Sequence, residues 1–128
     1  MSQAAPITTT VMFADICRST YLFNHLGDEK AAILIGELLK QTASVIEACD
    51  GTVLRTRGDD VLCIFSDPVN ALQASIDVHK KIHEFSSGTV GELSMKIGIN
   101  SGPAILSVGD ILGDTVNIAA RLCSFAKA

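Results

Sequence analysis

The feature that most constrains this chain is one tight, acidic turn between two short runs of strand-forming residues. The segment 52–65, TVLRTRGDDVLCIF, places apolar and β-branched residues on both sides of Gly58, Asp59 and Asp60. Because glycine and aspartate suit a tight turn between paired strands, the segment predicts a β-hairpin with two carboxylates at its tip. Turns favour these residues for their backbone geometry alone, so the hairpin by itself leaves the role of its acids open.

A second apolar run also leads to an acid. Residues 8–13 are almost all apolar or β-branched, as in a central strand covered on both faces, and Asp15 follows them. The small hydroxyl residues Ser19 and Thr20 then open a predicted short helix over 19–26, whose first backbone amides could hold a phosphate. Two acids at the ends of apolar strands indicate a divalent metal site beside that phosphate.

Apolar periodicity and capping residues predict three further helices. They run from Asp28 to about Cys49, from Pro68 through Val69, Leu72, Ile76 and His79 toward Glu84, and from Asp114 to about Phe125. The side chains of Asp28 and Asp67 are expected to cap the first two. The core stripe of the first of these helices consists of Ala31, Leu34, Ile35, Leu38, Val45, Ile46 and Cys49.

Two more strands, 93–100 and 104–108, are predicted around a turn at Ser101, Gly102 and Pro103. With no internal repeat and no linker, the order of elements predicts one α+β domain over residues 1–128. We expect a sandwich in which helices pack on a largely antiparallel sheet.

The last helix carries a polar pair. Asn117 and Arg121 are four residues apart and share one helical face, which taken alone is most simply an exposed polar stripe. The apolar residues of this helix are expected to pack inward; they are Val116, Ile118, Ala119, Ala120, Leu122 and Cys123.

Composition argues against several classes of protein. The net charge is -4, the isoelectric point is near 5.2 and no Lys or Arg cluster occurs, so a nucleic-acid surface is not expected. No apolar run reaches the ~18 residues of a membrane helix, so no membrane contact is expected. Cys17, Cys49, Cys63 and Cys123 show no CxxC spacing, and no signal peptide precedes them. Reduced thiols in a cytoplasmic protein are therefore expected.

Four segments together resemble a known family. VMFADICRST, GTVLRTRGDDVLCIF, IGINSGP and GDILGDTVNIAARL are similar to the successive motifs of the class III adenylyl and guanylyl cyclase catalytic domain, over about residues 8–122. The last motif is the most specific. The resemblance implies a ferredoxin-like domain that forms a head-to-tail homodimer with its active sites between subunits. It also implies two Mg²⁺ or Mn²⁺ ions per site and conversion of ATP to 3′,5′-cyclic AMP and pyrophosphate.

The same resemblance implies roles for individual residues. Asp15, Asp59 and the backbone of Ile16 would bind the metal ions, whereas Asp60 lies just past the motif and is not assigned as a ligand. The remaining assignments are phosphate binding by the backbone of Ile16, Cys17, Arg18, Ser19 and Thr20, base binding by Arg55 and Asp110, and catalysis by Asn117 and Arg121. The catalytic pair would orient the ribose and stabilise charge at the transferred phosphorus.

The base-binding positions favour ATP over GTP. Asp110 is the acceptor that adenylyl relatives direct at the adenine amino group, and Arg55 replaces their usual Lys as a donor for a ring nitrogen. Guanylyl relatives commonly have Glu and Cys there. Two other departures are Pro103, where some relatives have Arg near the phosphates, and a connector over 108–110 that is shorter than many dimerisation arms.

The family's domain normally continues past this last helix into strands that carry a triphosphate-binding Lys. The chain is therefore expected to be truncated at its C-terminus, or partly degenerate. A non-catalytic nucleotide-binding or dimerisation module, or a guanylyl cyclase, remains the alternative to an adenylyl cyclase. A palm-like enzyme such as a diguanylate cyclase is disfavoured, because no GGDEF-like hairpin occurs. An attached regulatory domain is compatible with the resemblance.

Overall fold

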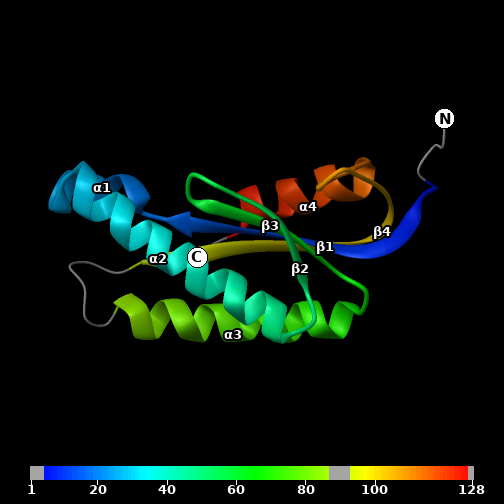
Figure 1. Cartoon of the computed structure of the whole chain (residues 1–128), viewed down its shortest axis with the longest axis horizontal. Helices are drawn as coiled ribbons and strands as arrows, with labels where there is room; N and C mark the ends of the chain where they lie inside the picture. Colours follow the sequence, from blue (N-terminus) through cyan, green and yellow to red (C-terminus); the bar gives the residue numbers. More distant parts are fainter. Residues whose placement is uncertain (1–4, 87–92, 127–128) are drawn as a thin grey trace.

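The structure, a computed structural model, describes residues 5–86 and 93–126. Its elements follow one another as β1 (Ile7–Cys17), α1 (Ser19–Leu26), α2 (Asp28–Ala48), β2 (Thr52–Arg57), β3 (Asp60–Phe65), α3 (Pro68–Ser86), β4 (Ser94–Ser107), β5 (Asp110–Leu112) and α4 (Asp114–Phe125) (Figure 1).

The strands form one antiparallel sheet with the order β2-β3-β1-β4-β5. β1 lies at the centre between β3 and β4, and helices connect β1 to β2 and β3 to β4. This connectivity is that of a ferredoxin-like fold, extended at one edge by β5. The predicted α+β sandwich on an antiparallel sheet is confirmed.

Helices cover both faces of the sheet, α2 and α3 on one side and α4 on the other (Figure 1). Alternate residues of β1 therefore enter two separate cores: Met12 faces α2 and α3, while Val11 belongs to the cluster beneath α4. The apolar run in β1 is almost continuous because both faces of this strand are buried. β1 is longer than predicted, so Asp15 lies within the strand and not after it.

The helix on residues 28–48 turns its predicted stripe toward the core, with four of the seven residues buried and Leu34, Val45 and Cys49 partly buried. Its cap differs from the prediction. Gly27, with φ 85°, occupies the N-cap position, and Asp28 is already helical and makes no capping hydrogen bond. α3 does have its predicted cap, because Asp67 Oδ1 accepts from the Val69 N–H at 2.9 Å. Of the apolar residues along α3, Val69, Leu72 and Ile76 are exposed, and the buried face consists of Ala71, Ala74, Val78 and Ile82.

The turn predicted at 101–103 is wrong, because β4 continues straight through these residues, with Pro103 opposite Thr8 of β1. Gly102 serves packing instead of a turn: a Cβ there would lie 2.6 Å from Thr115 Oγ1 of α4. The chain reverses at Val108 and Gly109, both with positive φ (32° and 75°), as in a type I′ hairpin.

α4 packs on the sheet through a narrow face. A Cβ on Gly98 would lie 2.3 Å from the Ala119 carbonyl oxygen, so glycine is required for this close approach. Val116, Ala119 and Cys123 are buried, whereas Ile118 and Leu122 are 39% and 45% exposed. The prediction that Ile118 and Leu122 pack inward is therefore wrong.

No helix within residues 5–86 and 93–126 is long and apolar enough to cross a membrane.

Candidate active site

The β2–β3 hairpin brings three carboxylates together. Arg57 pairs with Asp60 across the two strands, so Gly58 and Asp59 form a two-residue turn in which Gly58 has φ 60°. Asp60 is in turn the cross-strand partner of Asp15 in β1. Because directly paired residues point to the same face, the Asp15 and Asp60 side chains lie side by side, with Asp59 at the adjoining tip.

Local hydrogen bonds hold Asp59 in place. Its Oδ2 accepts from Ser19 Oγ at 2.8 Å, and its carbonyl oxygen accepts from the Ile16 N–H at 2.9 Å. The hairpin tip is thereby tied both to the end of β1 and to the start of α1. Since the Ile16 N–H is already used, the prediction that this amide holds a phosphate does not fit the structure.

The surroundings of Asp15 raise its proton affinity. Burial raises the pKa of Asp15, as do the nearby carboxylates of Asp59 and Asp60 and a hydrogen bond with Asp59. Lys96, its partner in β4, acts in the opposite direction. Negative charges held this closely favour a bound cation.

Asp15 and Asp59 are suitable ligands for Mg²⁺ or Mn²⁺, because hard cations prefer carboxylate and carbonyl oxygens. Within the described part of the chain, no group of three or more His, Cys, Asp or Glu side chains has metal-binding spacing. A metal here would therefore need main-chain oxygens and substrate oxygens in addition to these two acids.

The start of α1 lies directly after the end of β1. Arg18 has the left-handed conformation (φ 70°) at the N-cap and makes no side-chain cap, while its guanidinium lies 5.0 Å from the centre of the Tyr21 ring. The first amides of a helix have no partner within the helix, so those at Ser19 and Thr20 can donate hydrogen bonds to a phosphate. The side chain of Arg18 is directed toward the aromatic ring of α1.

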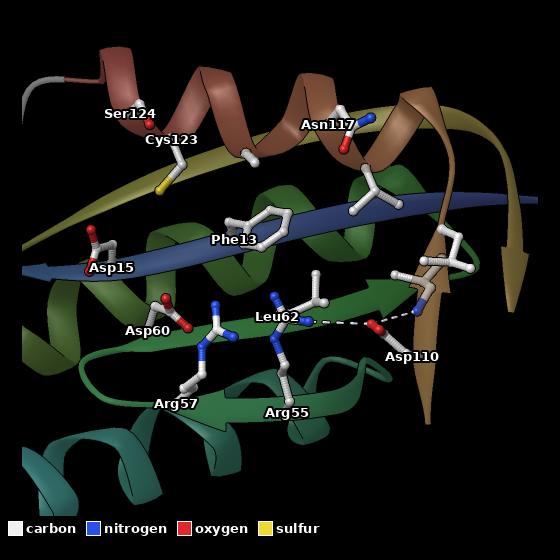
Figure 2. Close-up of a pocket in the computed structure, with 14 residues that line it drawn as sticks. Phe13, Asp15, Arg55, Arg57, Asp60, Leu62, Asp110, Asn117, Cys123 and Ser124 are labelled. Carbon is white, nitrogen blue, oxygen red and sulfur yellow. Dashed lines mark hydrogen bonds and ion pairs between the residues drawn. The ribbon is translucent and has the colours of Figure 1, made fainter. Parts of the chain in front are cut away.

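A cavity of about 420 Å³ lies between the hairpin, β1, β5 and α4. Figure 2 shows Asp15 and Asp60 at one end, Asp110 at the other, Arg57 and Arg55 between them, and Asn117 reaching in from α4. The other lining residues are Phe13, Leu62, Ile111, Leu112, Val116, Ala120, Cys123 and Ser124.

The two predicted base-binding residues contact each other. Arg55 Nη1 lies 3.3 Å from Asp110 Oδ1, and the same oxygen accepts from the Ile111 N–H at 2.8 Å. Their side chains are 35% and 47% exposed. Arg55 Nε is buried and has no hydrogen-bond partner among the described residues.

The structure brings some of the predicted site residues together and separates others. Asp15, Arg55, Asp110 and Asn117 line the same cavity. Asp59 instead lines a neighbouring hollow of about 270 Å³ with Ser19, and Arg121 is exposed on α4 outside both.

Sequence reasoning missed Arg57 and Asp60 as lining residues of this cavity. Both occupy the strand face that also carries Arg55 and Leu62, because alternate residues of a strand share a face. The alternation of side chains between the two faces of a strand would therefore have been sufficient to predict both residues. Cys123 was also missed; burial raises the pKa of its thiol to about 11, so it remains protonated at neutral pH.

Comparison with known proteins identifies a family that the chain matches and relatives with similar sequences. A family model described as "Adenylate and Guanylate cyclase catalytic domain" matches residues 3–128. Adenylate cyclase 1 of Rhizobium meliloti is 29% identical over 132 residues, covering 88% of this chain and 20% of that protein. An adenylate cyclase of Streptomyces coelicolor is 32% identical over 117 residues, covering 91% of this chain and 29% of that protein. The chain thus spans less than a third of either relative.

Solved structures have the same fold. The adenylyl cyclase CyaB from P. aeruginosa superposes with a TM-score of 0.87 and 25% identity, covering 100% of this chain and 76% of that chain. The monomeric guanylyl cyclase domain of the RhoGC fusion protein from Blastocladiella emersonii has a TM-score of 0.88 and 25% identity, covering 98% and 80%.

Proposed function

The chain belongs to the family of adenylate and guanylate cyclase catalytic domains, and we propose that it is an adenylyl cyclase domain that forms 3′,5′-cyclic AMP and pyrophosphate from ATP. One observation carries the proposal: a single cavity has acids at one end and the Arg55–Asp110 pair at the other. Its volume of about 420 Å³ is in the range of small-molecule sites. A triphosphate with metal ions suits the acidic end, and a base suits the other.

The metal ligands in this proposal are the carboxylates of Asp15 and Asp59 and the carbonyl of Ile16. Two bound Mg²⁺ or Mn²⁺ ions would lower the pKa of the ribose 3′-hydroxyl and neutralise the triphosphate. The like charges around Asp15 support this assignment, since they favour a cation. Ser19 holds the Asp59 carboxylate in a fixed orientation through its 2.8 Å hydrogen bond.

The reaction forms one P–O bond and breaks another. The ribose 3′-oxygen attacks the α-phosphorus, the bond to pyrophosphate breaks, and the hydroxyl proton leaves to solvent. The amides at Ser19 and Thr20 would hold phosphate oxygens, Asn117 would orient the ribose from α4, and Arg121 would stabilise charge on the transferred phosphoryl group.

A head-to-tail homodimer is part of the proposal. Arg121 is exposed outside the cavity of its own chain, so a partner's Arg121 is better placed to complete each site. Apolar side chains are exposed on β5 and α4, which border this cavity, and on the end of β4 that pairs with β5. They are Ile105, Leu106, Leu112, Ile118 and Leu122. Such exposed apolar residues favour an interface between two copies.

ATP is preferred over GTP in this proposal. The relatives from Rhizobium and Streptomyces are named adenylate cyclases, and Asp110 offers an acceptor for the adenine amino group. A guanylyl cyclase is the second candidate, because both kinds of cyclase have this fold.

The direct test is product formation by the purified chain. With Mn²⁺ and ATP or GTP, we expect cyclic AMP to form faster than cyclic GMP, and we expect an Asn117→Ala variant to be nearly inactive. Faster cyclic GMP formation would contradict the substrate. Nucleotide binding with no cyclic product from either nucleotide, in this chain and in a longer one, would contradict the enzyme and favour the binding module.

A further inference from the structure

We propose that Arg57 and Asp60 together bind the ribose 2′-hydroxyl of the nucleotide, so that the site selects a ribonucleotide over a 2′-deoxyribonucleotide. The inference rests on the proposed function, because it takes the ligand of the cavity to be a nucleoside triphosphate. It gives a role to two residues that line the cavity but are not among the metal-binding, base-binding or catalytic residues assigned above.

Arg57 and Asp60 face the cavity from two neighbouring strands. They are direct partners across β2 and β3, so their side chains leave the sheet on the same face, with Cβ atoms about 5 Å apart. Two opposite charges at this spacing commonly form an ion pair. None joins them here, and Arg57 makes no ion pair with any other residue within 5–86 and 93–126. The charges of both side chains are therefore available to a ligand.

The carboxylate of Asp60 lacks a hydrogen-bond donor. Its Oδ1 atom is buried from solvent and has no hydrogen-bond partner among the described residues. Oδ2 has no such partner either, but it is not buried, and the side chain lines the cavity. Because the two oxygens share one charge, a donor that reaches Oδ2 from the cavity would compensate a carboxylate that the described residues leave without a hydrogen bond.

A hydroxyl group suits this pair better than a phosphate or a metal ion. A phosphate would attract Arg57 but be repelled by Asp60, and a metal ion would attract Asp60 but be repelled by Arg57. A hydroxyl is neutral, and it can donate to the carboxylate while it accepts from the guanidinium. Two such hydrogen bonds through one oxygen span up to about 5.5 Å, which suits two charged groups that are too far apart for an ion pair.

The position of the pair in the cavity matches the position of the sugar. Figure 2 shows Arg57 between Arg55 and Asp60, beside the acidic end. The ribose joins the base to the phosphates, so a base at Arg55 and a triphosphate at the acids place the sugar between them. The 3′-oxygen is the attacking atom and is directed at the α-phosphorus. The 2′-hydroxyl is therefore the sugar group left for Arg57 and Asp60.

Two nucleotides test the inference by binding alone. They are α,β-methylene-ATP and its 2′-deoxy analogue, in which a carbon bridge between the α- and β-phosphorus prevents turnover, and calorimetry with Mg²⁺ measures their affinities. The 2′-deoxy analogue should bind the unmodified chain about tenfold more weakly, because it loses hydrogen bonds to charged groups. The same ratio is expected for the corresponding guanine pair, because the sugar is common to both. The result therefore does not depend on which base the site prefers.

Variants assign the effect to the two side chains. Arg57→Met and Asp60→Ala should each lower the ratio between the two affinities to about threefold, and the double variant should lower it to about one. Arg57→Lys and Asp60→Asn keep a donor and an acceptor, so each should retain most of the ratio. Arg55→Met is the matched control, because it removes the same charge from the same face of β2, two residues earlier. It should weaken both nucleotides equally and leave the ratio unchanged. Melting curves establish that each variant folds.

The inference is overturned if the two analogues bind the unmodified chain within about twofold of each other, or if neither binds. It is also overturned if Arg57→Met weakens both analogues equally, which would indicate a contact with phosphate, or if Asp60→Ala leaves the ratio unchanged. A chain that shows the expected ratios but forms no cyclic product contradicts the cyclase proposal and not this one. A chain that forms cyclic AMP but binds both sugars equally contradicts this inference and not the cyclase.

Discussion

Asp59→Asn should remove the stabilisation that Mn²⁺ gives to the folded chain. A ligand that binds only the folded state, at a concentration of about a hundred times its dissociation constant, stabilises that state by about 2.7 kcal/mol. With an unfolding entropy of about 2.1 cal/mol/K per residue, the 128 residues give about 270 cal/mol/K. The melting temperature of the original chain should therefore rise by about 10 °C.

Loss of one carboxylate ligand should weaken the metal about a hundredfold or more, since outer-shell changes alone cost 10- to 100-fold. At the same Mn²⁺ concentration the stabilisation then falls to about 0.4 kcal/mol, or about 1.5 °C. The substitution should leave the metal-free fold intact, because an asparagine oxygen can still accept from Ser19 Oγ, which lies 2.8 Å from Asp59 Oδ2.

Calorimetric or fluorescence melting with and without Mn²⁺ measures both quantities. Asp60→Asn is the matched control, since it makes the same change of charge at the next residue, which is not proposed as a ligand. This control should keep most of the 10 °C shift. A full shift in Asp59→Asn, or its loss in Asp60→Asn, would refute the metal assignment.

Three further predictions concern the assembly, the acids and the packing of α4. Mixing inactive Asp15→Ala and Arg121→Ala chains should restore about a quarter of the original activity, because about half of randomly paired dimers are mixed and each of these has one site with both its own Asp15 and the partner's Arg121; no recovery despite demonstrated subunit exchange would contradict a shared site. The raised pKa of Asp15 means that the chain loses stability as pH rises through that pKa. Metal-free Asp15→Asn should therefore be more stable than the original at pH 7, by less than about 1 kcal/mol, and the difference should vanish below about pH 4. Equal stability of the two chains at pH 7 would contradict the repulsion between the carboxylates. Gly98→Ala should lower the free energy of unfolding by about 1 to 3 kcal/mol, because its Cβ would lie 2.3 Å from α4 backbone atoms. Gly36→Ala in α2, where a Cβ would have nothing within 4 Å, should raise the free energy of unfolding by about 0.5 to 1 kcal/mol. Denaturant melts of the two variants would show these opposite signs.

The sequence predicts those elements whose signals are local. The β2–β3 hairpin, the cap at Asp67 and the bounds of α4 follow from turn residues, a capping side chain and helical spacing, and all three are confirmed. The antiparallel α+β sheet is confirmed as well. The site residues stay a prediction, because the structure holds no ligand that tests them.

The sequence predictions fail where contacts between residues far apart in the sequence determine the local structure. Ser101, Gly102 and Pro103 are typical turn residues, yet pairing with β1 keeps them extended, and Gly102 is needed because Thr115 of α4 lies against it. The real turn contains Val108, a β-branched residue at φ 32°, which sequence rules disfavour there. Tertiary pairing thus overrides local preference at both places.

The same close approach that was missed in β4 explains how α4 can serve a site and an interface at once. Because Gly98 and Gly102 let the helix lie against the strand, only its narrow stripe at Val116, Ala119 and Cys123 is buried. The next residue along from each of the first two, Asn117 and Ala120, borders the cavity. Ile118 and Leu122 are then left exposed on the same helix. A helix packed through larger side chains would stand farther from the sheet, so the small residues of β4 are what bring Asn117 to the border of the cavity. The exposed apolar pair beside it is the kind of surface that a second copy would bury, so the packing that shapes the cavity also supports the proposed dimer.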